Sequence, residues 1–217
     1  MHKLVLMGAE MKRLAFTMIE LVMAIVVLGI LAAVAIPKLD NDIRVGARDN
    51  IYSALQYTRQ LALVDNKTNP TDDEWQQELW AIRFSSDGDD GFTYSIFSNS
   101  DHGSNVDLEE SAIDPANGKY MFARAGRSTP EDDESPSVFL GQEFGINEVD
   151  FVGGCRGTQT LAFDHLGRPH VGGIFAKQDL YSQVMTTDCT ITIGFIDEDI
   201  EDLTFIVSKE TGFVRIL

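Results

Sequence analysis

A long apolar segment near the amino terminus is the feature that most constrains this chain. From Phe16 to Ile36, twenty-one positions contain a single charged residue, Glu20. A helix rises about 1.5 Å per residue, so a helix of this length matches a hydrocarbon layer about 30 Å thick. A Lys-Arg pair shortly precedes the segment, and such a basic flank is typical of the cytoplasmic side. We therefore expect a single-pass transmembrane helix over 16–36, with the following residues outside the cytoplasm.

The charge inside this segment needs an explanation, because a carboxylate in lipid is costly and ionisable groups there generally have a functional partner. Glu20 lies in the first turn of the expected helix, where the positive end of the helix dipole favours an anion. The simpler interpretation is a signal anchor in which the acid is incidental. The cost of an unpaired carboxylate favours a functional role for Glu20.

The residues around Glu20 resemble a known processing motif. Lys12-Arg13, the small residue Ala15 and the stretch Phe-Thr-Met-Ile-Glu are similar to the prepilin cleavage and methylation motif of type IV pilins and type II secretion pseudopilins. The resemblance implies that a membrane prepilin peptidase cuts between Ala15 and Phe16 and methylates the new amino group of Phe16. Ala15 stands where the family usually has glycine, and alanine is also small. The resemblance further implies that Glu20 neutralises the Phe16 amine of a neighbouring subunit, because two costly charges become tolerable as a pair.

Residues 1–15 are therefore expected to be a leader peptide, with Met1 or Met11 as its start. The leader holds three basic residues and one acidic residue, so its removal changes the net charge from −17 to −19. A mature chain this acidic argues against general nucleic-acid binding and for an acidic surface outside the cytoplasm.

After the apolar segment the pattern becomes one-sided. Beyond Pro37, apolar residues recur every three or four positions, which predicts an amphipathic helix over 37–64 that continues the first helix. The remaining residues, 65–217, are expected to form one globular head. Within it, residues from about 98 to 137 are rich in Asp, Glu, Ser, Gly and Pro, which predicts an irregular acidic insertion outside the core.

Short runs with alternating apolar residues, bounded by turn formers, predict the strands of the head. The first two flank a Gly/Asp-rich turn and are expected to form a hairpin. Together the strands predict an antiparallel sheet packed on the helix, an α+β fold that the resemblance identifies with the type IV pilin fold. The expected strands are 79–84, 92–97, 137–140, 148–152, 160–163, 190–195, 203–207 and 212–216.

Two regions near the carboxyl terminus, 161–169 and 205–216, narrow the resemblance. Leu161–Pro169, followed by Phe205–Ser208 and Thr211–Ile216, look like the paired carboxy-terminal signatures of the GspH/FimT group of minor pseudopilins and minor pilins. The long acidic insertion departs from the shorter members of that group.

The chain has two cysteines, Cys155 and Cys189, both in the part expected outside the cytoplasm. Two cysteines in an oxidising compartment are most simply explained by one disulfide. Closing a loop of this length would contribute about 3–4 kcal/mol by loop entropy. The alternative is two unpaired buried thiols.

Two places invite a metal interpretation. Asp164, His165 and His170 lie close in sequence but have no regular ligand spacing, so no metal site is expected there. The acidic turn Asp87–Asp90 could bind calcium, although its spacing does not fit an EF-hand loop. An acidic hairpin turn is the simpler interpretation.

One loop is locally basic. Arg156, Arg168 and Lys177 lie in a stretch with little acid, and such a loop could contact DNA, a role that the FimT side of the group suggests. The alternative is that these side chains pair with the acidic insertion, which the net charge of the chain favours.

These observations predict a structural subunit, a minor pseudopilin or minor pilin, of a type II secretion pseudopilus or type IV pilus. Its partners would be prepilin peptidase, other pilin subunits and the inner membrane, with the head in the periplasm. The alternatives are a DNA-binding minor pilin and, less favoured, a membrane-anchored hydrolase. No catalytic residue, cofactor or metal is predicted, because no phosphate-binding loop or nucleophile motif stands between a strand and a helix.

Overall fold

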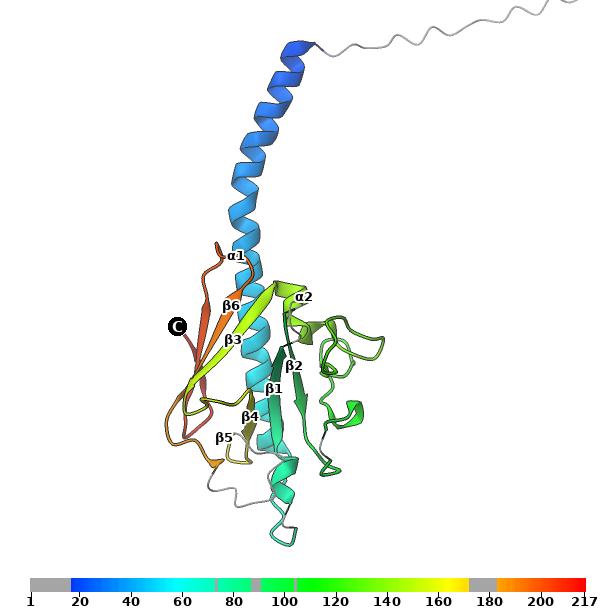
Figure 1. Cartoon of the computed structure of the whole chain (residues 1–217), viewed down its shortest axis with the longest axis vertical. Coiled ribbons are helices and arrows are strands. Elements are labelled where there is room, and N and C mark those ends of the chain that lie inside the picture. Colours follow the sequence, from blue (N-terminus) through cyan, green and yellow to red (C-terminus); the bar gives the residue numbers. More distant parts are fainter. Residues whose placement is uncertain (1–16, 73, 87–90, 104, 172–182) are drawn as a thin grey trace, which may run out of the picture. The chain divides into compact units, whose positions relative to one another are not determined.

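The computed structural model describes residues 17–72, 74–86, 91–103, 105–171 and 183–217, with only the backbone described for residues 32–41. The chain forms two compact units, Met1–Leu39 and Asp40–Leu217, and each is treated by itself. Helix α1 (Met18–Val64) contributes to both units (Figure 1). Its end agrees with the end predicted for the amphipathic helix, and Pro37 lies within it.

The larger unit is an α+β fold in which all strand pairs are antiparallel, as predicted. It has two four-stranded sheets rather than the single sheet that we expected. The first sheet has the order β2-β1-β4-β5 and the second the order β3-β6-β7-β8. The first contains β1 (Trp80–Ser86), β2 (Phe92–Phe97), β4 (Thr160–Phe163) and β5 (Pro169–Val171). The second contains β3 (Ile146–Gly153), β6 (Cys189–Phe195), β7 (Leu203–Val207) and β8 (Val214–Ile216).

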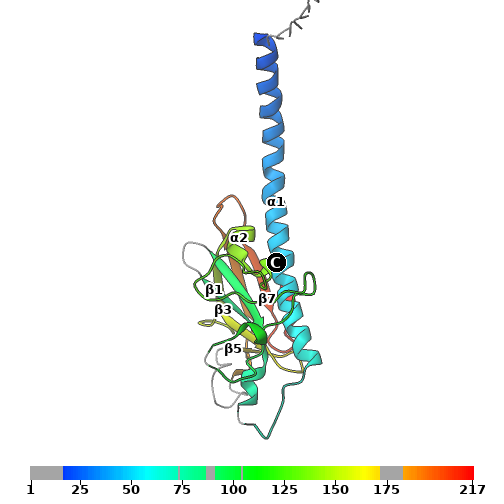
Figure 2. The same cartoon turned by 90° about the vertical axis from the view of Figure 1, so that its right-hand side faces the viewer.

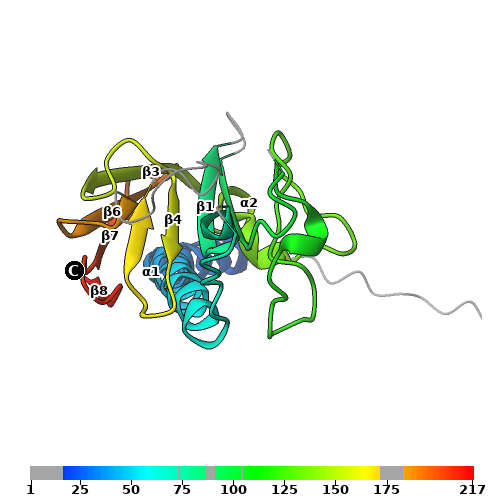
Figure 3. The ribbon, with the colours of Figure 1, turned by 90° about the horizontal axis from the view of Figure 1, so that it is seen from below.

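Both sheets pack against the carboxy-terminal part of α1 (Figure 3). The helix buries a stripe at three- and four-residue steps, as its periodicity predicts. Thr58 is polar but fully buried, and its hydroxyl donates to the Ala54 carbonyl at 2.8 Å, so it leaves no unpaired group. The rings of Phe84 in β1 and Phe151 in β3 pack edge to face, with their centroids 5.7 Å apart. This contact joins the two sheets in one core. The stripe consists of Ala47, Ile51, Ala54, Leu55, Thr58 and Ala62.

The segment 137–140 is not a strand, contrary to the prediction. A 3₁₀ turn (Pro136–Val138) is followed there by the short helix α2 (Leu140–Phe144). Pro136 occupies the first position of the turn, where its missing N–H is harmless, and Ser135 accepts a hydrogen bond from the N–H of Ser137. A short, continuous apolar run does not distinguish a strand from a buried turn.

The acidic insertion is irregular, as predicted, but it is not outside the core. Ala112, Met121 and Ala123 belong to the main apolar cluster. The N–H of Ala112 donates to the Ile96 carbonyl at 2.8 Å, and the N–H of Ile96 donates to the Met121 carbonyl at 2.9 Å. The insertion therefore covers the free edge of β2, where the green segment lies in Figures 1 and 2.

Two smaller elements are also present. A 3₁₀ helix spans Trp75–Glu78. Strand β5 was not predicted, because a three-residue strand that begins with proline carries too little pattern.

Candidate functional site

Helix α1 begins with a reciprocal set of hydrogen bonds between Thr17 and Glu20. The N–H and the hydroxyl of Thr17 donate to Glu20 Oε2 at 3.0 and 2.9 Å, and the N–H of Glu20 donates to Thr17 Oγ1 at 3.3 Å. This is a capping box, which satisfies two backbone donors at the helix start. Among the described residues, Glu20 Oε1 has no hydrogen-bond partner. The role of Thr17 was not predicted, although the Thr-x-x-Glu spacing signals it.

Residues 21–31 of α1, which follow the cap, are apolar on all sides. Every side chain described from Thr17 to Leu31 is exposed, and the large apolar ones range from 47% at Val22 to 87% at Met18. A helix that packs on its own chain normally buries one apolar stripe. Full burial of one such side chain contributes about 1.5–3 kcal/mol, so this surface has a strong tendency to be covered by another apolar surface.

Among the residues whose side chains are described, no helix combines the length and the apolar character needed to cross a membrane. The expected segment 16–36 falls only partly among these residues, because Phe16 and the side chains of 32–36 lie outside them.

Other predicted site residues also lie outside the described residues. They are Ala15 at the expected cleavage site, Asp87–Asp90 in the hairpin turn, and Lys177 in the basic loop. Cleavage after Ala15, calcium binding at Asp87–Asp90 and DNA contact at Lys177 therefore remain untested interpretations of the sequence.

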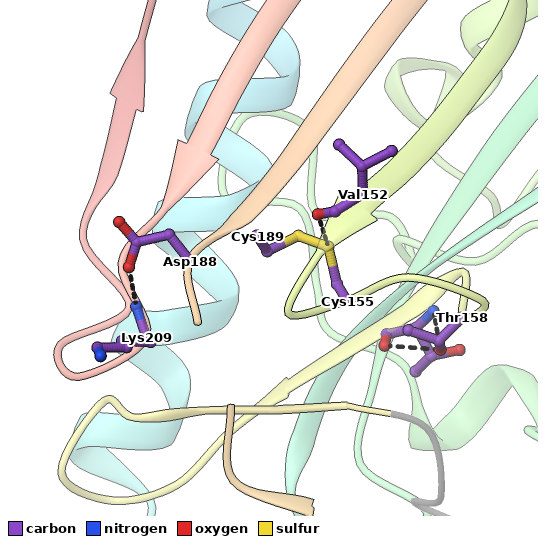
Figure 4. Close-up of a disulfide and its surroundings, with 7 residues drawn as sticks. Val152, Cys155, Thr158, Asp188, Cys189 and Lys209 are labelled. Atoms are coloured by element: carbon purple, nitrogen blue, oxygen red, sulfur yellow. Dashed lines mark hydrogen bonds between the residues drawn. A yellow bond between two sulfur atoms is a disulfide. The ribbon is translucent and has the colours of Figure 1, made fainter. Parts of the chain in front are cut away.

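Cys155 and Cys189 form the predicted disulfide, with their Cα atoms 5.1 Å apart and both side chains fully buried (Figure 4). Cys155 follows the end of β3, and Cys189 opens β6 opposite Gly153. Between the two cysteines the chain leaves the second sheet, contributes β4 and β5 to the first, and returns. The disulfide therefore closes the base of this excursion. The carbonyl of Val152 is 3.3 Å from the Cys155 sulfur, a contact only, because a disulfide sulfur carries no hydrogen.

Asp164 organises the turn between β4 and β5. Its carboxylate accepts hydrogen bonds from the N–H of Leu166 at 3.0 Å, from the N–H of Arg168 at 2.9 Å and from Arg168 Nε at 2.7 Å. His170 Nε2 lies 3.2 Å from the same carboxylate. Burial opposes ionisation of Asp164, but the hydrogen bonds from His170, Arg168 and Leu166 outweigh it and hold the pKa of Asp164 well below its usual range.

The two carboxy-terminal segments that carry the family resemblance lie against each other. Gly167 and Gly212 both adopt positive φ, 77° and 63°. A Cβ on Gly212 would collide with the Gly167 carbonyl and lie 2.8 Å from the Phe163 ring. Arg59 of α1 packs against Gly167 and donates to the Thr211 carbonyl at 2.7 Å. One contact region thus joins both segments to the helix.

Two of the three predicted basic residues, Arg156 and Arg168, belong to the described part of the chain. Arg168 forms an ion pair with Asp164, whereas Arg156 is exposed beyond β3, and no contact joins the two arginines. Among the described residues, Arg168 pairs with Asp164 and not with the acidic insertion, in which Arg127 pairs with Glu131 and Glu134. DNA contact stays a prediction.

The trio considered for metal binding does not converge in the described residues. His165 Nδ1 lies 3.2 Å from Thr68 Oγ1, away from the Asp164 pair. A different group, formed by Asp72, Glu78 and His102, has ligand atoms within 4.8 Å of one another. Within this group His102 Nε2 contacts Glu78 Oε1 at 3.1 Å, and Asp72 accepts a hydrogen bond from the N–H of Glu74 at 2.9 Å.

Comparison with known proteins adds no relative, since no family model, curated protein or solved structure matches the chain. Functional inference therefore rests on the motif residues, the capped apolar helix and the disulfide-bonded α+β unit.

Proposed function

We propose that this chain is a pilin-like structural subunit, a minor pilin or minor pseudopilin, that prepilin peptidase processes and that packs into a fibre through α1. Before assembly the apolar segment holds the chain in the inner membrane, with the head in the periplasm. The observation that carries the proposal is the start of α1. Exposed apolar side chains follow a capped turn in which Glu20 Oε1 has no hydrogen-bond partner among the described residues.

The capping box holds the Glu20 carboxylate in a fixed orientation for the proposed pairing with the Phe16 amine. Glu20 Oε2 receives both donors of its own Thr17, so the carboxylate is already oriented. Glu20 Oε1 is then available for the amine that cleavage creates at Phe16 of a neighbour. In an apolar fibre interior neither charge is tolerable alone, and their pairing sets the register between subunits.

The head supports the proposed location. Its disulfide is fully buried and closes the β4–β5 excursion, and structural disulfides persist in oxidising compartments such as the periplasm. The order of elements, one long helix followed by antiparallel strands, is also what the pilin resemblance implies.

Co-expression of the full chain with a prepilin peptidase tests the processing step. The expected product lacks residues 1–15 and begins with N-methylated Phe16, as read by intact mass and amino-terminal sequencing. Ala15→Gly should be processed at least as well, whereas Ala15→Leu, which enlarges the side chain before the cut, should remain unprocessed. A product that begins at another residue, or equal processing of both variants, would contradict the proposal.

A further inference from the structure

An apolar notch lies on the head between α1, α2 and the turn that joins β6 to β7. Its volume is about 590 Å³. Ile196 is 59% exposed and Ile43 is 37% exposed, so the notch offers large apolar side chains to an incoming group. Its apolar lining consists of Ile43, Phe144, Phe195, Ile196 and Ile200.

The walls of the notch are held in place by the fold. Phe144 packs directly on α1 at Gly46, where a Cβ would lie 3.1 Å from the ring. Gly145 ends α2 in the left-handed conformation, and its carbonyl accepts the N–H of Ile196 at 2.8 Å. The notch is therefore a preformed feature and needs little ordering when it is filled.

An acidic turn, residues 197–202, borders the notch. Five of its six residues are acidic, and all five are exposed. Arg44 of α1 fixes the turn by donating to the carbonyls of Glu201 and Asp202 at 2.9 and 3.2 Å, so it binds the backbone of the turn and not its carboxylates. Glu143 adds a further exposed acid to the lining.

The charge around the notch selects the occupant. A second copy of this chain has a net charge of −17, so it would bring acidic groups against the acidic turn. Five of its 17 Lys and Arg residues are also engaged with acids of their own chain among the described residues. They are Arg48, Lys67, Arg127, Arg168 and Arg215. The notch therefore fits a different protein, one that carries Lys or Arg around an apolar side chain.

We propose that the apolar notch and the acidic turn together bind such a basic protein segment, with its apolar side chain in the notch and its cations against the turn. The inference rests on the proposed function only in identifying the partner as another fibre subunit. Apolar contact at the centre supplies affinity, and the charged rim supplies selectivity and fast association.

Photo-crosslinking in the producing cell tests this inference with the full chain. The photoreactive amino acid p-benzoylphenylalanine replaces Ile196, and the adduct is identified by mass spectrometry. The expected adduct joins a different protein through a peptide that contains Lys or Arg beside an apolar residue. An adduct with a second copy of this chain, or no adduct, overturns the inference.

A matched pair of triple variants tests the role of charge. Neutralising the turn should lower the adduct yield about fivefold, since rim charges mainly govern association. Asparagine at 197 keeps the acceptor that Asp197 offers to the N–H of Asp199. Neutralising three exposed acids of the insertion should leave the yield unchanged, and equal loss in both overturns the inference. The turn variant is Asp197→Asn/Glu198→Gln/Asp199→Asn, and the control is Glu109→Gln/Asp132→Asn/Asp133→Asn.

The two proposals fail separately. If the chain is processed at Phe16 and found in fibres but the turn variant crosslinks normally, the docking inference is wrong and the proposed function stands. If processing fails while charge-dependent crosslinking persists, the proposed function is wrong and the docking surface stands.

Discussion

Replacement of Asp164 by asparagine is expected to destabilise the head strongly, because this carboxylate accepts four hydrogen bonds. The asparagine oxygen can keep the bonds that Oδ1 receives from the N–H groups of Leu166 and Arg168. Its amide group, however, would face Arg168 Nε, so a donor would meet a donor there. His170 Nε2 could accept from the amide only as the tautomer protonated at Nδ1, a buried atom without a hydrogen-bond partner among the described residues.

The expected loss follows from these two contacts. A hydrogen bond to a charged group contributes about 1.5–3 kcal/mol. The Arg168 side chain is 35% exposed and can regain hydration, whereas His170 is 5% exposed and cannot. We therefore expect Asp164→Asn to lower the free energy of unfolding by about 2–4 kcal/mol, a large share of the stability of a typical domain.

Urea unfolding of the compact unit Asp40–Leu217, followed by the fluorescence of Trp75 and Trp80, measures this loss. The exposed acid Asp150 on β3 provides the matched control, Asp150→Asn, with an expected effect below about 0.5 kcal/mol. Equal unfolding midpoints for the two variants would refute the reasoning.

The loss should also depend on pH in a defined direction. The pKa of Asp164 is lowered in the folded state, so its contribution is complete above the unfolded pKa of about 3.9 and is lost as the pH falls through the folded pKa. The difference between parent and variant should therefore be the same at pH 7 and pH 5 and should shrink below about pH 4. A difference that already disappears at pH 5 would contradict this assignment.

Two further changes test the packing of the head. Cys155→Ser together with Cys189→Ser should lower the free energy of unfolding by about 3 kcal/mol through loop entropy, as measured by thermal unfolding against the disulfide-bonded parent. The reduced parent should unfold like the double variant. Gly212→Ala should cost more than about 2 kcal/mol, because the methyl group would collide with the Gly167 carbonyl in a backbone conformation that already disfavours alanine. Gly118 has a similar φ of 75°, but a Cβ there would have no atom within 4 Å, so Gly118→Ala should cost only about 1 kcal/mol. Equal losses of stability at the two glycines would contradict the role of the collision.

The local sequence pattern was sufficient to predict the helix and most of the strands. The end of α1 at Val64, the hairpin of β1 and β2 and the bounds of β7 agree with the sequence prediction. Each of these elements has a clear period bounded by turn formers, so neighbouring residues determine it. The disulfide was predictable because the chain has only two cysteines.

The division into two sheets was not predictable, because it depends on which strands pair over long separations. β3 and β6 are neighbours in one sheet, while the intervening strands β4 and β5 belong to the other. No local pattern encodes this exchange. Among the described residues, only the pair Cys155 and Cys189 indicates in the sequence that the chain leaves the second sheet after β3 and returns at β6.

The order within the acidic insertion was missed for a similar reason. Asp114 is 5% exposed and accepts hydrogen bonds from the hydroxyls of Ser135 and Ser137 and from the amide of Asn117. Burial opposes its ionisation, but these bonds outweigh it and lower the pKa of Asp114. In sequence, an aspartate among serines and glycines indicates only a surface loop. Its partners about twenty residues away become visible only in the folded chain.

The central claim is that the charge of Glu20, rather than its role in the helix cap, places this chain in a fibre. Glutamine at position 20 can still complete the capping box with Thr17, since either residue serves there, but it carries no charge. Thr17→Val removes the cap, at a cost of about 1 kcal/mol, and leaves the charge. The decisive measurement is the fraction of processed chain found in sheared fibres. Our account predicts at least a tenfold lower fraction for Glu20→Gln, as expected when a buried ion pair loses one partner, and near-parental incorporation for Thr17→Val. Incorporation of Glu20→Gln at the parental level would contradict it.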